Sequence, residues 1–467
     1  MGRHKISDAQ KERCNVKIVL IGAGSAQFGL GTLGDIMQSR VLAGARIVLV
    51  DINEESLDQV RRAAELFVER HRLPFIVDAT TERAAALAGA DFVIISIEAG
   101  NRFDLWDMDW GLPLQYGIRQ VYGENGGPGG LFHALRIVPP ILAICDDVAR
   151  ICPEAFVFSY SNPMTAITTT VLRKHPKLKF VGLCHEIASL QRYLPVILGL
   201  PLEELSYRAA GLNHFSALIE ARYAKTGEDA YPDILAKAPA FFEKEQGYSD
   251  AFEYALRTGK IPLTEGATER YKLDRGEASR PWSDRLLFRE ILERFSLLPI
   301  TGDSHVGEYI PWAYEVADHK GILDFYAFYK MMLGGERPEI ELKLRERVVP
   351  IMEGIIEDSG YEEGAVNILN EGYIPGLPSD IAVEVPANIG AKGLSGLAFP
   401  AYPKGFCGLL RNYCGVYDMT AEAILAGRRD YVIQALLVNP VVNTCSRLDE
   451  LVDVMIERQR PWLDYLK

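Results

Sequence analysis

The chain has 467 residues, of which 48% are hydrophobic and 24% are charged, proportions that fit a globular protein of about two or three domains. Its formal net charge is −13 at pH 7, so it lacks the concentrated basic face that nucleic acid or an anionic membrane requires. We therefore expect a small-molecule substrate, with no nucleic-acid partner and no membrane partner.

The cysteines and the first residues indicate the compartment. Seven cysteines in so long a chain, an odd number without dense spacing, are typical of reduced thiols in the cytosol. Residues 1–15 form a polar leader without the apolar core of a signal peptide, and no later run reaches the roughly 18 apolar residues of a membrane helix. We expect a cytoplasmic protein.

A glycine-rich turn follows the first predicted strand. The near-continuous apolar run at residues 16–21 predicts a buried parallel strand. Gly22, Gly24 and Ser25 come next, ahead of a predicted helix, which is the order of a dinucleotide-binding turn. The third glycine of that motif is replaced by Gln27, so a plain structural turn is the alternative.

An acidic residue follows the second predicted strand, at residues 45–50. Asp51 stands at the strand tip, where the adenosine ribose of a nicotinamide cofactor would lie, and an acid there favours NAD over its phosphorylated form. Further strands at residues 75–77 and 90–97 complete a doubly wound half-sheet. Ser96, near the end of the latter, is a candidate cofactor contact.

Two polar segments follow in the next part of the chain. Residues 122–130, which include Glu124, contain five glycines and a proline, a composition that lets backbone approach a ligand closely or forms a flexible hinge. A predicted strand at residues 155–160 then leads to Asn162, whose amide can donate and accept hydrogen bonds at the ligand edge of the sheet. The alternative for Asn162 is a turn-forming role.

A thiol and an imidazole follow two later apolar segments. The predicted strand at residues 180–183 leads to Cys184 and His185, and a segment from residue 207 ends at His214. A thiolate and a neutral imidazole together suit a divalent transition metal, so we predict that Cys184 and His214 share one ion. The alternatives are a buried thiol for Cys184 and a hydrogen-bonded core histidine for His214.

These elements predict an α/β fold with two domains, similar to lactate and malate dehydrogenases. Residues 16–200 form an NAD-binding Rossmann domain with a doubly wound sheet. Residues 201–467 form an α+β domain for substrate, metal and oligomerisation, beginning with antiparallel strands. Its predicted helices lie at residues 285–295, 323–333, 341–358 and 420–437.

The chain resembles glycoside hydrolase family 4 over nearly its whole length. The resemblance rests on motifs that are specific in combination. They are Gly22-Ala-Gly-Ser, Gly127-Pro-Gly-Gly130, Ser161-Asn-Pro, Cys184-His-Glu, Gly211-Leu-Asn-His-Phe215, Gly302-Asp-Ser-His-Val-Gly-Glu-Tyr309, and Asn370 with Leu377-Pro and Val383-Glu-Val-Pro386. The family uses NAD and a divalent metal, usually manganese, to cleave glycosides.

The resemblance implies a metal site and a substrate class. Cys184 and His214 match the family's metal ligands. The Cys184-His-Glu sequence looks most like the branch that acts on α-galacturonides, and His185 disfavours 6-phosphorylated sugars. Neutral α-galactosides and α-glucosides are the nearest competitors, and α-glucuronides are a further alternative.

The implied reaction is a hydrolysis with internal oxidation and reduction. NAD removes a hydride from C3 of the sugar, and the metal polarises the new ketone, which makes the C2 proton acidic. A base removes that proton, the glycosidic oxygen leaves C1, water adds, and the hydride returns. No NAD is consumed, and the two-carboxylate scheme of most glycosidases does not apply.

Three residues are candidate catalytic groups by this resemblance. Glu124 stands where family members usually have Asp. Asp303 and His305 lie in the Gly302–Tyr309 motif, and each has a loop-bracing role as its alternative. The family's tyrosine base has no certain counterpart, and Arg289 is the residue that aligns with it.

The candidate substrate contacts come from both halves of the chain. They are Asn162, His185, Glu186, Asn213 and Arg289. If the substrate is a uronide, its carboxylate needs a cationic partner, ideally an arginine that binds both oxygens. Arg280, Arg285 and Arg289 are the candidates, and each has a solvated helix face as its alternative.

We therefore predict a cytoplasmic, NAD- and Mn²⁺-dependent α-glycosidase, most similar to α-galacturonidases and assembled as a homodimer or homotetramer. One rival is an NAD-dependent 2-hydroxy-acid dehydrogenase, which would consume NAD and need no thiolate-bound metal. Another is a non-catalytic NAD-binding sensor.

Overall fold

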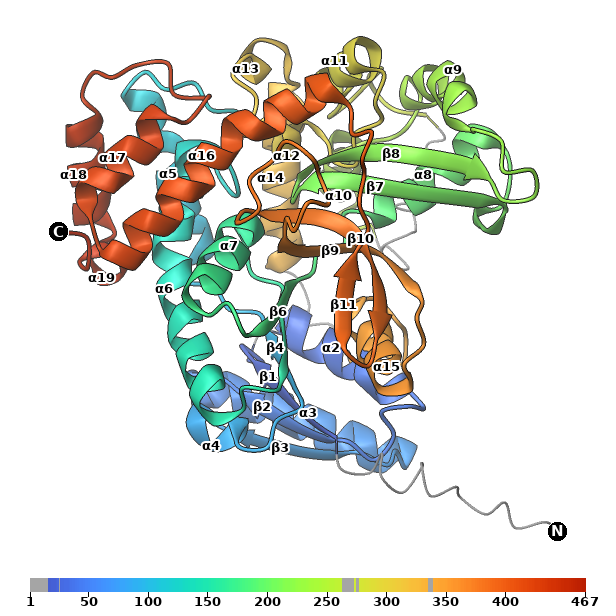
Figure 1. Cartoon of the computed structure of the whole chain (residues 1–467), viewed down its shortest axis with the longest axis vertical. Helices are drawn as coiled ribbons and strands as arrows, with labels where there is room; N and C mark the ends of the chain where they lie inside the picture. Colours follow the sequence, from blue (N-terminus) through green and yellow to red (C-terminus); the bar gives the residue numbers. More distant parts are fainter. Residues whose placement is uncertain (1–15, 25, 263–272, 274–276, 335–338) are drawn as a thin grey trace.

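The computed structural model describes residues 16–24, 26–262, 273, 277–334 and 339–467 (Figure 1). The predicted leader at residues 1–15 and the predicted cofactor contact Ser25 lie outside this part of the chain.

Six parallel strands form one side of the sheet, in the order β3-β2-β1-β4-β5-β6. They are β1 (Lys17–Ile21), β2 (Arg46–Val50), β3 (Ile76–Thr80), β4 (Phe92–Ile95), β5 (Phe156–Ser159) and β6 (Lys179–Gly182). Every pair is parallel, and apart from the edge strand β3 these strands are largely apolar and buried, as expected for a parallel sheet covered on both faces. The predicted doubly wound α/β fold is confirmed.

Alternate residues of these strands enter two separate cores. In β1, Val19 and Ile21 belong to the core on one face, whereas Ile18 and Leu20 belong to the core on the other. The helices of this half are α2 (Ala26–Gln38), α3 (Glu54–His71), α4 (Arg83–Leu87), α5 (Arg102–Gln115), α6 (Gly127–Ile151), α7 (Met164–Lys174) and α8 (Ala188–Leu198). Because both faces are covered, the carboxyl edge of the strands is the place left for a ligand.

Helix α6 begins inside the glycine-rich segment, at Gly127, where the sequence predicted neither helix nor strand. This helix is long and apolar enough to cross a membrane by composition, but 83% of the apolar window is buried inside the protein. It is therefore a core helix, and its buried side chains belong to the larger core.

The sheet continues through the second half of the chain with antiparallel strands, as predicted. They are β7 (Leu205–Leu212), β8 (Phe215–Tyr223), β9 (Glu362–Leu369), β10 (Ala382–Gly390) and β11 (Gly393–Gly396). Strand β9 pairs with β6 through Gly182 and Asn367, and the order continues β9-β10-β7-β8. One sheet therefore runs through both predicted domains, and the β7–β8 turn is held close to the end of β6.

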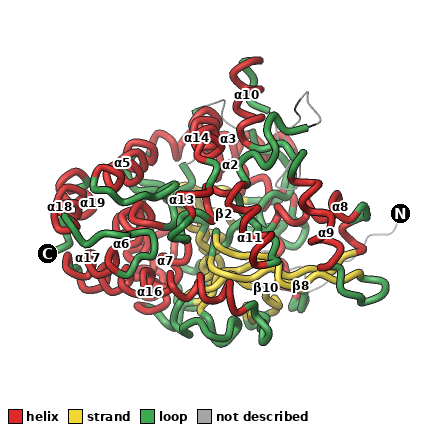
Figure 2. The backbone as a smooth tube through the Cα atoms, turned by 90° about the horizontal axis from the view of Figure 1, so that it is seen from above, coloured by secondary structure: helices red, strands yellow, loops and turns green. Residues whose placement is uncertain are grey.

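The second half of the chain also contributes the remaining helices (Figure 2). They are α9 (Tyr231–Phe242), α10 (Tyr248–Thr258), α11 (Leu286–Phe295), α12 (Asp303–Val306), α13 (Ala313–Val316), α14 (His319–Leu333), α15 (Val348–Glu357), α16 (Lys404–Ala426), α17 (Arg429–Leu437), α18 (Leu448–Arg458) and α19 (Arg460–Leu463), with a short 3-10 helix, η2 (Leu202–Glu204). The predicted single helix at residues 420–437 is wrong, because Gly427 ends α16 in the left-handed conformation with φ of 64°.

Candidate functional site

The glycine-rich turn brings three strand ends together. Gly22 has φ of 89°, and a Cβ there would lie 1.9 Å from the backbone oxygen of Ser96. The Gly24 N–H donates to Asp51 Oδ2 at 2.8 Å, and a Cβ on Gly24 would lie 2.8 Å from the same atom. The structure therefore places four predicted cofactor contacts, Gly22, Gly24, Asp51 and Ser96, side by side at the carboxyl edge of β1, β2 and β4.

Gly29 provides a close approach between helix and turn that the sequence prediction missed. A Cβ on Gly29, in the first half of α2, would lie 2.3 Å from the backbone oxygen of Ala23. The usual third glycine of a dinucleotide turn permits such helix–strand packing. Here Gln27 stands at that position. Gly29, two residues later in the sequence, is the glycine from which this close approach could have been predicted.

A cavity of about 360 Å³ opens beside this turn, within the usual size range of small-molecule sites. Eight of the predicted site residues line it. They are Ser96, Glu124, Asn162, Cys184, His185, Glu186, His214 and His305. The sheet extension explains this convergence, because Cys184 follows β6 and His214 forms the β7–β8 turn.

Three side chains in this cavity form a compact group of possible metal ligands. One ligand atom each from Glu124, His214 and His305 lies within 4.8 Å of the others. The rings of His214 and His305 are 4.5 Å apart between centroids. Burial lowers the pKa of His214 well below its usual value, with the charge of His305 adding to the effect, and a neutral imidazole is the form that binds a metal.

Asn125 lies beside one ring nitrogen of His214. The Asn125 Nδ2 atom lies 3.0 Å from His214 Nδ1, while Asn125 Oδ1 is buried without a hydrogen-bond partner among the described residues. Turning the amide by half a rotation would let His214 Nδ1 donate to Oδ1. His214 Nε2 would then offer its lone pair to an ion, which is the usual outer arrangement of a metal-bound histidine.

Cys184 is half-buried and lines the same cavity, but it is not one of the three clustered ligands. Burial and the charge of Glu186 raise the pKa of its thiol well above the usual range, whereas the Asn213 amide favours the thiolate. A divalent cation would reverse the effect of burial. The shared ion of Cys184 and His214 stays a prediction.

Asn213 is a positioning residue in this geometry. Its Nδ2 donates to Glu384 Oε2 at 2.9 Å, and the Ser216 hydroxyl donates to Glu384 Oε1 at 2.7 Å. Asn213 is buried and is not among the cavity-lining residues. Its predicted substrate contact therefore gains no support, and Glu384 orients it beside Cys184.

Two residues that the sequence prediction left without a role hold Glu124 in place. The guanidinium of Arg102 pairs with Glu124 Oε1, and Arg102 itself lies 5.2 Å from the ring centroid of Trp106. The buried carboxylate of Glu308 accepts the backbone N–H groups of Glu124 and Asn125 at 2.5 and 3.1 Å. Glu308 belongs to the Gly302–Tyr309 motif, so the sequence indicated that this residue matters but did not indicate its role.

Asp303 has a structural role, and its predicted catalytic role is not supported. It is fully buried, and its carboxylate accepts the backbone N–H groups of Leu287, Phe288 and Asp318 at 3.0, 2.9 and 2.8 Å. Burial raises the pKa of its carboxyl group to about 7, although the three hydrogen bonds act to lower it. Asp303 lines neither this cavity nor the pocket beside it. Its hydrogen bonds instead brace α11 and the segment before α14.

Arg289 does not reach a site. Its side chain is 47% exposed, pairs with Glu293 at 2.7 Å and packs against Trp282. Arg280 is paired with Asp318 at 2.6 Å. Of the three arginines considered from the sequence, only Arg285 is buried in a pocket, and the predicted substrate contact of Arg289 therefore gains no support.

Comparisons with known proteins agree over nearly the whole chain. The model of the family 4 glycosyl hydrolases matches residues 17–200, and the model of the family 4 glycosyl hydrolase C-terminal domain matches residues 209–442.

Individual relatives are similar over the same length. An alpha-glucosidase of Erwinia rhapontici is 62% identical over 451 residues, which cover 97% of this chain and 99% of the relative. An alpha-galacturonidase of Thermoanaerobacterium saccharolyticum is 26% identical over 483 residues, covering 96% and 97%. The structure of a 6-phospho-alpha-glucosidase from gut microorganisms, in complex with NAD and Mn²⁺, is similar with a TM-score of 0.73 and 20% identity, covering 97% of this chain and 100% of that one.

Proposed function

The chain belongs to family 4 of the glycosyl hydrolases, and from that premise we propose that it hydrolyses α-glucosides with NAD and a divalent ion such as Mn²⁺. The observation that carries the substrate is the 62% identity to an alpha-glucosidase over 97% of this chain. Family membership makes the protein a glycoside hydrolase, so the dehydrogenase and sensor alternatives are not proposed.

α-Galacturonides, which the sequence favoured, are the second candidate. The alpha-galacturonidase relative is only 26% identical, so the resemblance of the Cys184-His-Glu motif carries less weight than the overall identity. One structural feature still favours an acidic sugar, because Arg192 and Arg285 line the pocket beside the cavity. Three carboxyl side chains line that pocket as well, and we therefore place neutral glucosides first.

The residues at the carboxyl edge fit NAD. Gly22 and Gly24 keep the turn free of side chains where a Cβ would collide, and Asp51 presents a carboxylate at the tip of β2. This carboxylate already accepts the N–H groups of Gly24 and Asn53 at 2.8 and 2.9 Å, which fixes its orientation toward the expected position of a ribose.

The cavity fits a divalent ion. We assign its binding to Cys184 and His214, with Asn162 nearby, whose buried Oδ1 atom has no hydrogen-bond partner in the part of the chain that the structure describes. When bound, NAD accepts and returns a hydride and the ion polarises an oxygen of the sugar.

The other cavity residues would orient the sugar and move protons. His305 Nδ1 is 2.7 Å from Ser304 Oγ, and His305 Nε2 is 3.9 Å from Glu186 Oε1. We assign proton transfer to His305 Nε2, because Ser304 holds the ring at Nδ1 and His305 lines the cavity. Arg102 holds Glu124 in place, and His185 and Glu186 bind sugar hydroxyls at the cavity rim.

A panel of nitrophenyl glycosides tests the substrate assignment. With NAD, Mn²⁺ and a reducing agent present, we expect nitrophenol release from the α-D-glucoside to be the fastest. The α-D-galacturonide, α-D-glucuronide and α-D-galactoside serve as comparisons. Faster cleavage of the galacturonide would restore the second candidate, and cleavage of none would contradict the proposed function.

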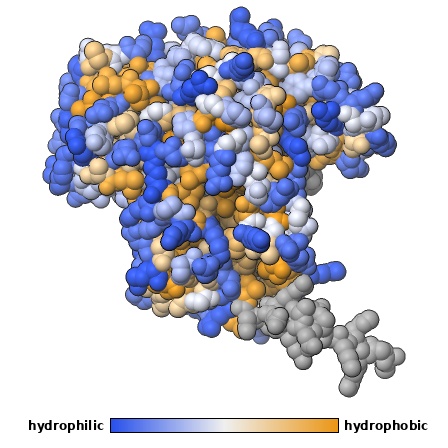
Figure 3. All heavy atoms as spheres, viewed as in Figure 1, coloured by the Kyte–Doolittle hydropathy of each residue, from blue (hydrophilic) through white to orange (hydrophobic). Residues whose placement is uncertain are grey.

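Localisation and assembly remain proposals. The family resemblance implies a cytoplasmic homodimer or homotetramer, as expected from the sequence. Figure 3 shows hydrophobic residues gathered at the upper left of the visible face, where Figure 1 draws α16 and α17. In that region Leu437 and Val438 are 51% and 46% exposed, which supports contact with another copy of the chain.

A further inference from the structure

A carboxylate from the second half of the chain lines the cavity beside the glycine-rich turn. Glu346 belongs to residues 339–347, the segment that precedes α15, and it lines the cavity together with Tyr160. Burial raises the pKa of the Tyr160 phenol well above its usual value, and the charge of Glu346 is the second contribution. The carboxylate of Glu346 therefore lies close to this phenol. Neither the sequence motifs nor the reaction described above uses the residue.

Asp35, a residue of α2, holds Glu346 in place through the backbone. Asp35 is fully buried, and its two carboxylate oxygens accept the backbone N–H groups of Arg345 and Glu346, each at 2.9 Å. The helix and the segment are in close contact, because a Cβ on Gly34 would lie 2.1 Å from the backbone oxygen of Glu341. The helix that follows the glycine-rich turn therefore fixes the position of Glu346 in the cavity wall.

The cavity has more acidic than basic side chains. Its carboxyl groups are those of Glu124, Glu186 and Glu346, whereas Arg102 is the one arginine or lysine among the described residues that line it. Arg102 already pairs with Glu124. Glu346 has no ion-pair partner within the described part of the chain, so its charge acts on whatever enters the cavity.

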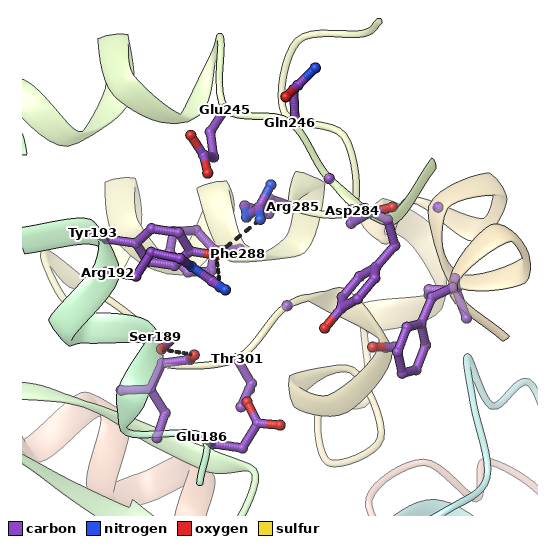
Figure 4. Close-up of a pocket in the computed structure, with 18 of the residues that line it drawn as sticks. Glu186, Ser189, Arg192, Tyr193, Glu245, Gln246, Asp284, Arg285, Phe288 and Thr301 are labelled. Carbon is purple, nitrogen blue, oxygen red and sulfur yellow. Dashed lines mark hydrogen bonds between the residues drawn. The ribbon is translucent and has the colours of Figure 1, made fainter. Parts of the chain in front are cut away.

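Two further arginines belong to the pocket beside the cavity. Figure 4 shows Arg192 and Arg285 directed to the hydroxyl of Tyr193, to which they donate at 2.9 and 3.1 Å. Neither arginine lines the cavity, whereas Glu186 lines both spaces. The described walls of the cavity therefore offer an anionic ligand no arginine or lysine that is not already paired.

The size of the cavity brings any charge on a ligand near Glu346. A volume of about 360 Å³ corresponds to a round space roughly 9 Å across, which is about the Debye length at physiological ionic strength. Like charges at such separations repel, and walls of low dielectric constant strengthen the repulsion. Glu346 therefore opposes a carboxylate or phosphate on the sugar, whereas a hydroxyl of a neutral sugar can donate to it.

We propose that Glu346 is a specificity-determining residue that excludes sugars with an anionic substituent, and that Asp35 is the positioning residue that holds it in the cavity wall. This inference rests on the proposed function, because the cavity must hold the sugar that is cleaved. The preference for a neutral sugar then comes from the side of α2 as well as from the Cys184-His-Glu motif.

Replacing Glu346 by Gln tests the specificity role, because glutamine keeps the shape of the side chain and removes its charge. Inhibition of p-nitrophenyl α-D-glucoside cleavage is measured with D-glucose and with D-glucuronic acid, which differ only at C6. We expect the ratio of the inhibition constants, glucuronic acid over glucose, to fall at least about tenfold in the variant. The change should shrink at high salt.

Glu341→Gln is the matched control. Glu341 lies in the same segment, but its side chain is 61% exposed and it does not line the cavity. This variant loses the same charge from the protein, so the ratio of the inhibition constants should stay at the wild-type value. An equal fall in Glu341→Gln would overturn the specificity role, because the effect would then come from net charge.

Asp35→Asn tests the positioning role. The amide oxygen can accept only one of the two backbone N–H groups, so the segment should shift and the ratio should fall in the same direction. Adding Asp35→Asn to Glu346→Gln should cause no further fall, because Asp35 acts on specificity only through Glu346. A lower Tm without a change in the ratio would overturn the positioning role and leave Asp35 with a structural one.

The outcomes separate this inference from the reaction itself. An unchanged ratio in a folded Glu346→Gln protein that still cleaves the aryl glucoside would overturn the specificity role and leave the proposed function intact. If the wild-type protein cleaved no α-glucoside, the proposed function would fail, and the inference with it. Glu346→Ala, which also removes the charge, gives the same readout if Glu346→Gln does not fold.

Discussion

Replacing Cys184 by Ser, or His214 by Ala, is expected to reduce hydrolysis by at least about a thousandfold, because polarisation by a bound ion contributes several kcal/mol to such a reaction. Both residues line the cavity beside the glycine-rich turn, but neither belongs to the turn itself. NAD binding should therefore survive. Turnover measured with Mn²⁺, together with NAD affinity by calorimetry, checks both expectations.

Cys445→Ser is the matched control for the cysteine variant. Cys445 is an exposed free thiol and lies outside the cavity, so its loss should leave turnover unchanged. Wild-type turnover by either cavity variant at trace Mn²⁺ would contradict the shared ion. If only His214→Ala lost activity, the ion would be held by the group of Glu124, His214 and His305 instead.

Replacing Gly22 by Ala is expected to lower NAD affinity at least about a hundredfold, because the positive φ angle and the steric overlap both displace the turn. The added Cβ would lie 1.9 Å from the Ser96 backbone oxygen. Backbone cannot move aside as a flexible side chain can, so the end of β1 or β4 must shift. Affinity measured by calorimetry tests this expectation.

Gly31→Ala provides the control for the glycine variant. Gly31 lies in the following helix, α2, and outside that helix's own backbone a Cβ there would meet no atom of the described residues within 4 Å. Alanine is the better helix former, so NAD affinity should be unchanged and thermal stability equal or higher. Wild-type NAD affinity in a folded Gly22→Ala protein would show that the turn does not hold the nucleotide.

The parts of the fold that depend on residues close together in the sequence were predictable. Apolar runs predicted the six parallel strands, and the order of strand, glycine-rich turn, helix, strand and Asp51 predicted the nucleotide turn. The pairing of β6 with β9 was not predictable, because Gly182 and Asn367 are far apart in the chain. That pairing forms the sheet extension beside which Cys184 and His214 lie.

The arginines show why helical spacing was not enough. Arg285 and Arg289 are four residues apart, which would place them on one face of a helix. Arg285 instead precedes α11 with φ of −142° and ψ of 28°, so the helical period does not extend to it. Its side chain enters the pocket, while Arg289 lies outside.

Asp303 shows the same limit for helix capping. A capping acid normally stands directly before its helix in the sequence. Asp303 instead follows α11 in the sequence, yet its carboxylate accepts the backbone N–H groups of Leu287 and Phe288 at the N-terminus of that helix. The motif Gly302–Tyr309 indicated an important segment, but only the fold separates the bracing role of Asp303 from the cavity position of His305.

The most direct test of the account is to remove metal with a chelator and nucleotide with charcoal, and then to measure nitrophenol release from p-nitrophenyl α-D-glucoside after adding NAD, Mn²⁺, both or neither. We predict activity only when both are added, without accumulation of reduced NAD. Equal turnover without either addition would contradict the proposed NAD- and metal-dependent hydrolysis.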